Sequence, residues 1–170
     1  MPVVLIVRRA DRTEVDAAIE VWKAASSESQ LAGHPEHLRA WAGASGAVLF
    51  VADSGTTLIG MALSLVGRAN DGAGEPIPGL RHLTGVAVLP EHQGSGVGGR
   101  LLDAALDHAH SVGCDRVTLW TGRTNARAQR LFAARGFHPT GRTMPDDAGA
   151  AMVHFAVELD PDSLEEDPSA

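Results

Sequence analysis

A glycine-rich stretch that opens a helix is the part of the sequence best suited to chemistry. Residues 93–99 read QGSGVGG; they follow an apolar, strand-like segment and precede apolar residues at helical spacing. The first-turn amides of a helix lack internal partners and lie at the positive end of its dipole. Glycines let a bulky anion approach those amides. The stretch therefore predicts a phosphate or pyrophosphate site rather than a plain flexible turn.

The glycine spacing also admits a dinucleotide-binding interpretation. Gly94, Gly96 and Gly99 match G-x-G-x-x-G, which requires an acid about 20 residues later, at the end of the next strand. Asp115 has about that spacing, but it precedes the expected strand at 116–120. This departure disfavours NAD binding, which remains a second alternative. No G-K-[ST] follows the loop, so a P-loop nucleotide site is excluded.

The elements that must position this loop follow from hydrophobic periodicity and capping signals. Asp11 and Glu14 form a capping box at the start of the first helix. The glycine- and proline-rich segment 67–79 predicts a long loop, either a substrate-side element or a mobile one. The expected elements are strand 3–8, helices 12–26 and 35–41, strands 48–52, 57–66 and 81–88, helix 94–112, strand 116–120, helix 125–135, and strands 137–143 and 151–159.

This order, βααβββαβαββ, predicts the fold class. Antiparallel strands come first and a βαβ crossover follows, which implies a mixed α/β sheet in one domain. We expect that domain to cover residues 1–159. Residues 160–170 hold five acids and no base, and we expect an acidic, disordered tail there.

Composition excludes several classes of protein. The net charge is −7, and without the tail it is 14 bases minus 16 acids, or −2, so no basic patch points to nucleic acid. No apolar run is long enough to span a membrane, and no signal peptide is recognisable. Cys114 is the only cysteine, which excludes a disulfide framework and a multi-cysteine zinc site, and we expect no metal. A cytoplasmic protein follows. Its single lysine among abundant arginine, alanine and glycine suggests a bacterial source.

Two motifs in the right order resemble the GNAT N-acetyltransferase superfamily. Gln93-x-x-Gly96-x-Gly98, after the segment 86–90 (VAVLP), resembles the acyl-CoA loop of that family. Residues 125–137 (NARAQRLFAARGF) resemble its second motif, a helix followed by Gly-Phe. The resemblance extends over residues 4–159 and implies a GNAT-like, mostly antiparallel central sheet flanked by helices.

The resemblance implies acetyl-CoA as co-substrate and assigns the residues that hold it. Backbone groups of Val86 and Val88 would pair with the pantetheine arm like an added strand, where a bulge splays their strand from 116–120. An amide of the segment 86–88, which includes Ala87, is the expected oxyanion donor. Asn125 would contact CoA near its thiol end, and it also suits a plain helix N-cap. The pyrophosphate would be held by backbone amides of Gln93, Gly94, Ser95, Gly96, Val97, Gly98, Gly99 and Arg100.

The chemistry implied is direct attack of an amine on a thioester, which needs a general base. His82 lies where many family members carry a glutamate base, and histidine titrates near neutral pH. The alternative for His82 is a histidine that is merely packed or exposed. Phe132 stands where many relatives have the tyrosine that protonates the leaving thiolate, and the chain contains no tyrosine. Phe132 would instead pack against the acetyl or pantetheine end, and a thiolate is a tolerable leaving group.

The sequence thus predicts an N-acetyltransferase whose acceptor is a primary amine of a small molecule or of a peptide or protein. The alternative from another class is a non-catalytic acyl-CoA-binding module. The N-terminal helices with Trp22 and Trp41, the loop 67–79 and the turn 143–150 would wall the acceptor site. Trp120, at the end of its strand, suits the core. A homodimer is compatible with family habit.

Overall fold

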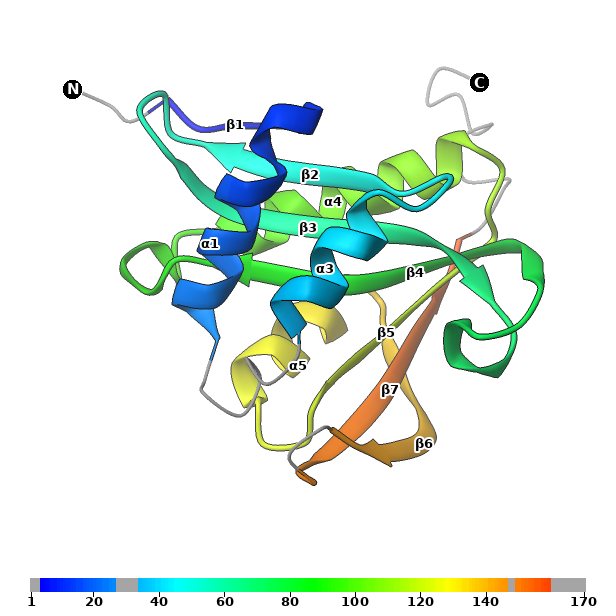
Figure 1. The fold of residues 1–170 in the computed structure, drawn as a ribbon. Coiled ribbons are helices and arrows are strands. Elements are labelled where there is room, and N and C mark those ends of the chain that lie inside the picture. The colour runs from blue at the N-terminus through cyan, green and yellow to red at the C-terminus, as the bar shows by residue number, and fades with distance from the viewer. Residues whose placement is uncertain (1–3, 27–33, 147–148, 160–170) are drawn as a thin grey trace, which may run out of the picture.

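Seven strands form one continuous central sheet (Figure 1). The computed structural model describes residues 4–26, 34–146 and 149–159, so the acidic segment 160–170 lies outside the described residues. The strand order is β1-β2-β3-β4-β5-β7-β6, and every neighbouring pair is antiparallel except β4 and β5. This confirms the predicted mixed, mostly antiparallel sheet.

The elements follow the predicted order, and most bounds differ from the predicted ones by only a few residues. The strands are β1 (Ile6–Arg9), β2 (Val48–Asp53), β3 (Leu58–Arg68), β4 (Pro76–Val88), β5 (Arg116–Gly122), β6 (His138–Pro145) and β7 (Ala151–Glu158). The helices are α1 (Val15–Ala25), α3 (His34–Ala42), α4 (Val97–Ser111) and α5 (Ala126–Ala133), with 3-10 turns η1 (Arg12–Glu14), η2 (Asn70–Gly72) and η3 (Pro90–His92). No helix in the described part of the chain is long and apolar enough to cross a membrane.

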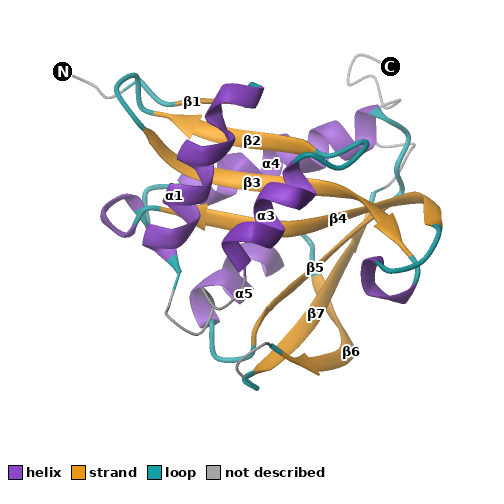
Figure 2. Cartoon of the chain, in the orientation of Figure 1, coloured by secondary structure: helices purple, strands orange, loops and turns teal. Residues whose placement is uncertain are grey.

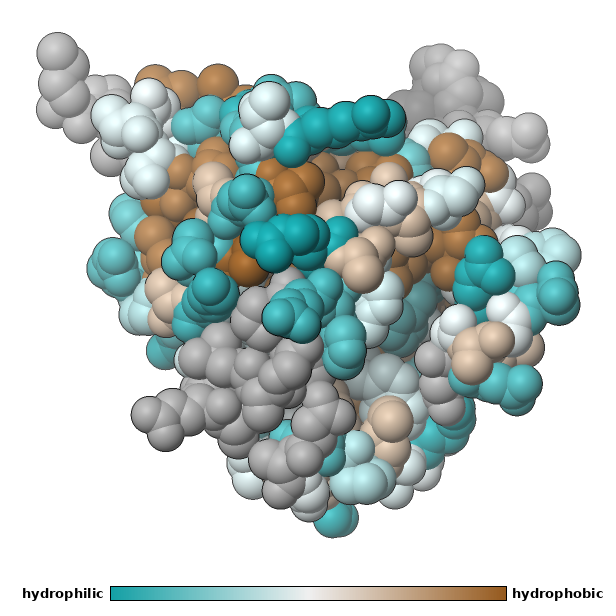
Figure 3. All heavy atoms as spheres, viewed as in Figure 1, coloured by the Kyte–Doolittle hydropathy of each residue, from teal (hydrophilic) through white to brown (hydrophobic). Residues whose placement is uncertain are grey.

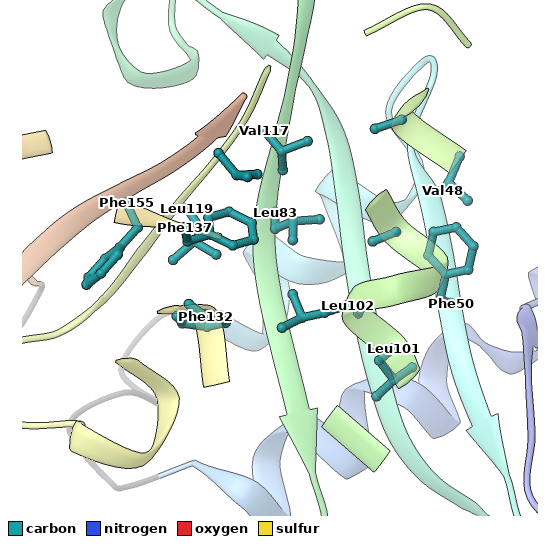
Figure 4. Packing of buried hydrophobic residues seen from close by; sticks show 14 of the residues in the cluster. Val48, Phe50, Leu83, Leu101, Leu102, Val117, Leu119, Phe132, Phe137 and Phe155 are labelled. Atoms are coloured by element: carbon teal, nitrogen blue, oxygen red, sulfur yellow. The ribbon is translucent and has the colours of Figure 1, made fainter. Parts of the chain in front are cut away.

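Helices cover both faces of the sheet (Figures 1 and 2). The face under α1 and α3 buries Ala18, Ile19, Val21, Leu38, Val51, Met61, Leu63 and Ala87. The larger cluster, under α4 and α5, includes Phe50, Leu83, Leu101, Leu102, Val117, Leu119, Phe132, Phe137 and Phe155 (Figure 4). On the outer surface of α1 and α3, hydrophilic side chains are interspersed with hydrophobic ones (Figure 3). The central strands β2, β3 and β4 therefore supply residues to two separate apolar layers.

The predicted loop 67–79 is wrong in extent, because β3 and β4 both continue into it as a hairpin. Its end is closed by η2 and by a backbone bond of 3.0 Å from the Ala69 amide to the Glu75 carbonyl. Gly67 is required by the packing, since a Cβ there would lie 2.2 Å from Cγ of Leu80. The composition that predicted a loop thus belongs to a tightly bonded hairpin end.

One extra residue in β4 shifts its register against β3. Leu63 pairs with Gly85 and Ser64 pairs with Leu83, so Thr84 has no opposite residue. This is a β-bulge, which bends the strand that carries it. The bulge exchanges the faces of the strand: Leu83 packs under α4, whereas Ala87, four residues later, packs under α1.

The parallel pairing of β4 with β5 ends immediately before the bulge. It runs from Leu80 opposite Arg116 to Leu83 opposite Leu119. Beyond that point the two strands diverge, as Figure 1 shows. Residues 85–88 of β4 therefore pair with β3 on one side only.

A carboxylate–guanidinium group ties the edge strand β1 to its neighbours. Arg8 donates to both carboxylate oxygens of Glu14, at 2.7 and 2.8 Å, and to Asp53 at 3.0 Å. Glu14 also accepts from the Asp11 amide, which confirms the predicted capping box. Chiefly through the Arg8 bonds, the pKa of Glu14 falls from its ordinary value to about 2.

We predict that Glu14→Gln lowers the melting temperature at neutral pH and that the difference from wild type shrinks in acid. A carboxyl with a depressed pKa stabilises the fold fully above its unfolded value and loses that contribution as the pH falls through about 2. Glutamine keeps the bond to the Asp11 amide, so the change isolates the charge. Thermal melts between about pH 3 and 7 measure the effect.

The matched control is Glu20→Gln, which removes a carboxylate from an exposed helical pair with Lys23. Exposed pairs contribute little, so its melting temperature should follow wild type across the range. An equal shift of the melting temperature in both variants, or a Glu14→Gln shift that persists in acid, would contradict the stabilising role of the Glu14 charge.

Candidate active site

The loop before α4 is shaped by two glycines in the left-handed conformation. Gly96 is the N-cap and takes φ +88°, and Gly94 takes φ +82°; a Cβ at either position would meet open space. Both positive φ values favour glycine. Because α4 is fifteen residues long, the orphan amides of Val97, Gly98 and Gly99 lie at the positive end of a substantial dipole. The amide of Arg100 already donates to the Gly96 carbonyl at 3.1 Å, and its guanidinium donates to the Leu5 carbonyl at 3.1 Å.

The other two glycines of the stretch serve helix packing. A Cβ at Gly98 would lie 3.0 Å from Leu131 of α5, and one at Gly99 would lie 2.1 Å from Nη2 of Arg135. Arg135 also approaches Asp103 at 3.4 Å. The stretch 93–99 is thus two features in one: a loop shaped by positive φ, and a helix surface that lets α5 approach.

Gln93 bridges the two sides of the loop. Its amide nitrogen donates to the carbonyl of Val88 at 3.0 Å, and its oxygen accepts from Arg127 of α5 at 3.0 Å. The guanidinium of Arg127 is therefore held beside the loop, and that of Arg135 lies next to Gly99 in the first turn of α4. This end of α4, the helix mouth, is suited to an anion by backbone geometry and by charge.

Residues Val86, Ala87 and Val88 lie in the part of β4 that has separated from β5. Val86 and Val88 pack toward the α4 side and Ala87 toward the α1 side. The chain pairs with β3 there, so the strand edge turned toward β5 is available for an extended ligand. The bulge and the splay that the family resemblance implied are present.

His82 lies near the end of the β4–β5 pairing, on the face of the sheet that α1 and α3 cover. It is opposite Thr118 in register, and its Nδ1 is 2.8 Å from Thr118 Oγ1. The neighbouring residue Arg81 points to the other face and anchors the strand. It is 5% exposed and donates to Ser64 Oγ, the Ser64 carbonyl and the Gly46 carbonyl, at 2.9 to 3.0 Å. Burial lowers the pKa of Arg81 from its ordinary value.

A cavity of about 800 Å³ opens on the α1/α3 face above the paired ends of β4 and β5; we call it the sheet cavity. His82 and Thr118 lie in its floor, and Trp41 and the β3–β4 hairpin end line its walls. The floor continues across β5, β7 and β6, where Trp120 contacts His154 with ring centroids 4.8 Å apart. The guanidinium of Arg142 lies 5.4 Å from the Trp120 ring centroid.

Two of the sequence-predicted residues have evident structural roles. Asn125 is the N-cap of α5, and its side-chain oxygen accepts from the Ala128 amide at 3.2 Å. Phe132 is 6% exposed and packs against Phe137 and Phe155, at ring distances of 5.9 and 6.3 Å. The apolar residue at the tyrosine position of the family therefore belongs to the core under α4 and α5.

The structure brings together cavity residues that the sequence analysis missed. Arg142 and His154 attracted no prediction, and Trp120, which was assigned to the core, is half-buried in the cavity floor. Trp41 lines the cavity as predicted. Trp22, which belongs to α1, packs against the apolar cluster beneath that helix and is not among the lining residues. Side chains alternate between the two faces of a strand, so Thr118 and Trp120 share a face of β5, and this pattern could have placed Trp120 beside the site. The position of His154 next to Trp120 follows from the β5–β7 register. Within the described ranges, no three His, Cys, Asp or Glu side chains cluster as a metal site would.

Several solved acetyltransferases share this architecture. The chain matches the ribosomal-protein-S18-alanine N-acetyltransferase of Escherichia coli with a TM-score of 0.68 and 18% identity, over 92% of this chain and 94% of that one. It matches a Salmonella typhimurium protein, solved with its cofactor acetyl-CoA, with a TM-score of 0.71 and 22% identity over the same shares. At these identities the likeness establishes the fold, and the expected GNAT-like fold is confirmed.

The sequence itself establishes the family. Residues 15–137 match the acetyltransferase (GNAT) family, and the chain belongs to that family. A mycothiol acetyltransferase of Thermobispora bispora is 38% identical over 88 residues, which is 52% of this chain and 29% of that protein. An uncharacterized N-acetyltransferase of Archaeoglobus fulgidus is 44% identical over 48 residues, 28% of this chain and 33% of that one. The matched segments thus span about a third of the length of these relatives.

Proposed function

We propose that this protein transfers the acetyl group of acetyl-CoA to a primary amine. The observation that carries the proposal is the order in which three features follow one another along β4 and the loop after it. The mouth of α4 leads along the unpaired edge of residues 84–88 to the point where β4 and β5 meet, and His82 lies there in the floor of the sheet cavity. A long anionic donor at one end and an amine at the other would meet at this histidine.

The proposed roles on the donor side follow that path. The amides of the segment 93–99 hold the pyrophosphate, aided by the arginines around the helix mouth. Val86 and Val88 pair with the pantetheine arm, and the Gln93 side chain must release the Val88 carbonyl if the arm bonds there. Asn125 keeps its oxygen in the helix cap and offers its NH₂ group to the arm. Phe132 supports the acetyl end from the core.

The reaction requires one proton to leave the amine. In the proposed step His82 accepts that proton, the amine nitrogen bonds to the thioester carbonyl carbon, and a backbone amide of the segment 86–88 stabilises the oxyanion. The C–S bond then breaks, the acetylated amine leaves, and the CoA thiolate takes a proton from solvent. No tyrosine is needed for that last proton, because a thiolate is a stable leaving group near neutral pH.

Thr118 has a defined part in this proposal. The ring nitrogen Nε2 of neutral His82 can accept a proton only in the tautomer in which Nδ1–H donates to Thr118 Oγ1. Thr118 is therefore a positioning residue that fixes the ring, and its hydroxyl can accept from Nδ1–H in the tautomer that the proposed step requires.

The primary test measures release of CoA thiol from acetyl-CoA against a panel of amines that includes amino acids, polyamines, aminoglycosides, arylamines and peptide N-termini. Amine-dependent release with a matching acetylated product supports the proposal. Acetyl-CoA binding without release for any amine would instead support the acyl-CoA-binding module, the alternative that the same glycine stretch allows.

We predict that His82→Gln lowers kcat by about 100-fold or more at neutral pH, because it removes the general base. The KM for acetyl-CoA should change little, since His82 lies on the acceptor side. Thr118→Val should lower kcat severalfold and alter the pH profile, whereas Thr118→Ser, which keeps the hydroxyl, should restore both. Steady-state kinetics across pH provide the readout.

His138→Gln is the matched control, because this exposed histidine bonds to Glu158 on β7 and does not line the cavity. Its kcat should equal that of wild type. Wild-type turnover in the His82→Gln variant would remove His82 as the base and leave the binding path untouched.

We predict that Gly96→Ala weakens acetyl-CoA binding at least tenfold. Alanine meets no neighbour there, so the cost is the positive φ, about 1 kcal/mol if the loop holds its shape. A loop that relaxes instead displaces the amides that hold the pyrophosphate. Calorimetric titration with acetyl-CoA, and with NAD as the competing ligand class, measures the effect.

Gly113→Ala supplies a matched control at the other end of α4. Gly113 has φ +84° and equally open surroundings, so alanine imposes the same strain away from the helix mouth. Both variants should lose similar thermal stability, and only Gly96→Ala should lose affinity for acetyl-CoA. Equal affinities in the two variants, or tighter binding of NAD than of acetyl-CoA, would overturn the assignment of the loop.

A further inference from the structure

The described lining of the sheet cavity has charge of one sign. Among its lining residues that the structure describes, the charged side chains are those of Arg68, Arg116 and Arg142, and none is a carboxylate. The whole chain has 21 acids against 14 bases, so composition alone would favour the opposite sign. The cavity therefore departs from the chain around it in the sense that attracts anions.

The three arginines make different contacts within the described part of the chain. Arg116 approaches Glu158 at 3.8 Å, which offsets part of its charge. Arg68 donates to the Gly74 carbonyl at 3.2 Å, at the hairpin end. Arg142 is placed over the Trp120 ring, in the floor that also holds His82. Arg142 is thus the arginine that is held in the cavity floor by an aromatic ring.

The local structure of β6 explains why Arg142 points into the cavity. The register between β6 and β7 shifts between Pro139 and Thr143, so the intervening residues bulge from the ladder. Within this bulge Thr140 bonds to Nδ1 of His154 at 2.7 Å, and His154 is 5% exposed. This buried contact fixes the floor beneath Trp120 and so the ring on which Arg142 rests.

Stacking on an aromatic ring uses the flat face of a guanidinium, while recognition of a carboxylate uses its edge of N–H donors. The two contacts are compatible in one geometry. Around Arg142 the lining is apolar: Met144, Met152 and Trp120 lie on neighbouring strands. The combination is a cation next to an apolar, polarizable surface, with a histidine in the same cavity.

We propose that the acceptor is an amine that also bears a carboxylate, as an apolar amino acid does. This inference rests on the acetyl transfer proposed above and specifies its substrate class. Arg142 binds the carboxylate, the apolar side chain lies against Trp120 and the two methionines, and the amine is presented to His82. The same charges work against polyamines and aminoglycosides, because a polycation would bring several positive charges to a cavity that holds three arginines.

The test compares matched triplets that share an amine and a side chain: L-leucine, L-leucinamide and 3-methylbutylamine, and the corresponding phenylalanine series. The amide has the less basic amine and so offers more neutral nucleophile at neutral pH, which works against the expected order. We expect the amino acid to exceed both analogues in kcat/KM by about tenfold or more, as loss of a charge-assisted bond implies.

Arg142→Gln should abolish that preference by raising the KM for the amino acid about tenfold and leaving the amide unchanged. Arg142→Lys should restore part of it, since lysine keeps the charge without the fork. Arg12→Gln, in η1 and outside the cavity lining, is the charge-matched control and should behave as wild type. Thermal melts show whether each variant is folded.

Binding is measured beside turnover, with the acceptor titrated into protein saturated with CoA. Turnover of the amide or the plain amine at least as fast as the amino acid would overturn the carboxylate proposal and leave acetyl transfer standing. Selective binding of the amino acid without turnover, lost in Arg142→Gln, would support the anion site and count against acetyl transfer. If the protein shows no turnover and no selective binding of the amino acid, the carboxylate proposal and the acetyl-transfer proposal are both overturned.

Discussion

The single extra residue in β4 is the constraint on which the rest of the site depends. Because Thr84 has no partner in β3, the strand bends there, and its parallel pairing with β5 stops at Leu83 and Leu119. The separated edge of β4 can accept an extended ligand only because it is not completed by β5. The same bend leaves His82 and Thr118 as a pair at the closed end of the gap. A continuous β4–β5 ladder would remove both features together.

The mouth of α4 shows how packing and binding constrain the same residues. Gly98 and Gly99 allow the side chains of Leu131 and Arg135 to lie where a Cβ would force each of them to shift. That approach brings a guanidinium to a helix end whose amides already favour an anion. Because Gly96 is not pressed by any neighbour, its glycine is required by backbone conformation alone. One short stretch thus joins two helices and shapes a loop, which explains its density of glycine.

Features encoded within a short stretch of chain could be predicted from the sequence, and features set by distant register could not. The capping box at Asp11, the glycine-opened helix and the order of elements are local patterns, and all are present. The hairpin end between β3 and β4 was missed because its glycines indicate a loop, whereas Gly67 is there to admit Leu80. The cavity floor was missed for a different reason. Arg142 and His154 reach Trp120 only through the β5–β7–β6 pairing and the bulge in β6.

The charge of the chain and the charge of its site are separate physical quantities. A net charge of −7 describes the chain as a whole, yet charges farther apart than about 10 Å are largely screened at physiological salt. What a ligand meets is local: arginines at the helix mouth on one side and Arg142 in the sheet cavity on the other. An acidic protein can therefore hold two anionic ligands end to end. If each is held by its anionic end, their uncharged ends, a thioester and a neutral amine, are directed to the point where β4 leaves β5, and His82 lies there.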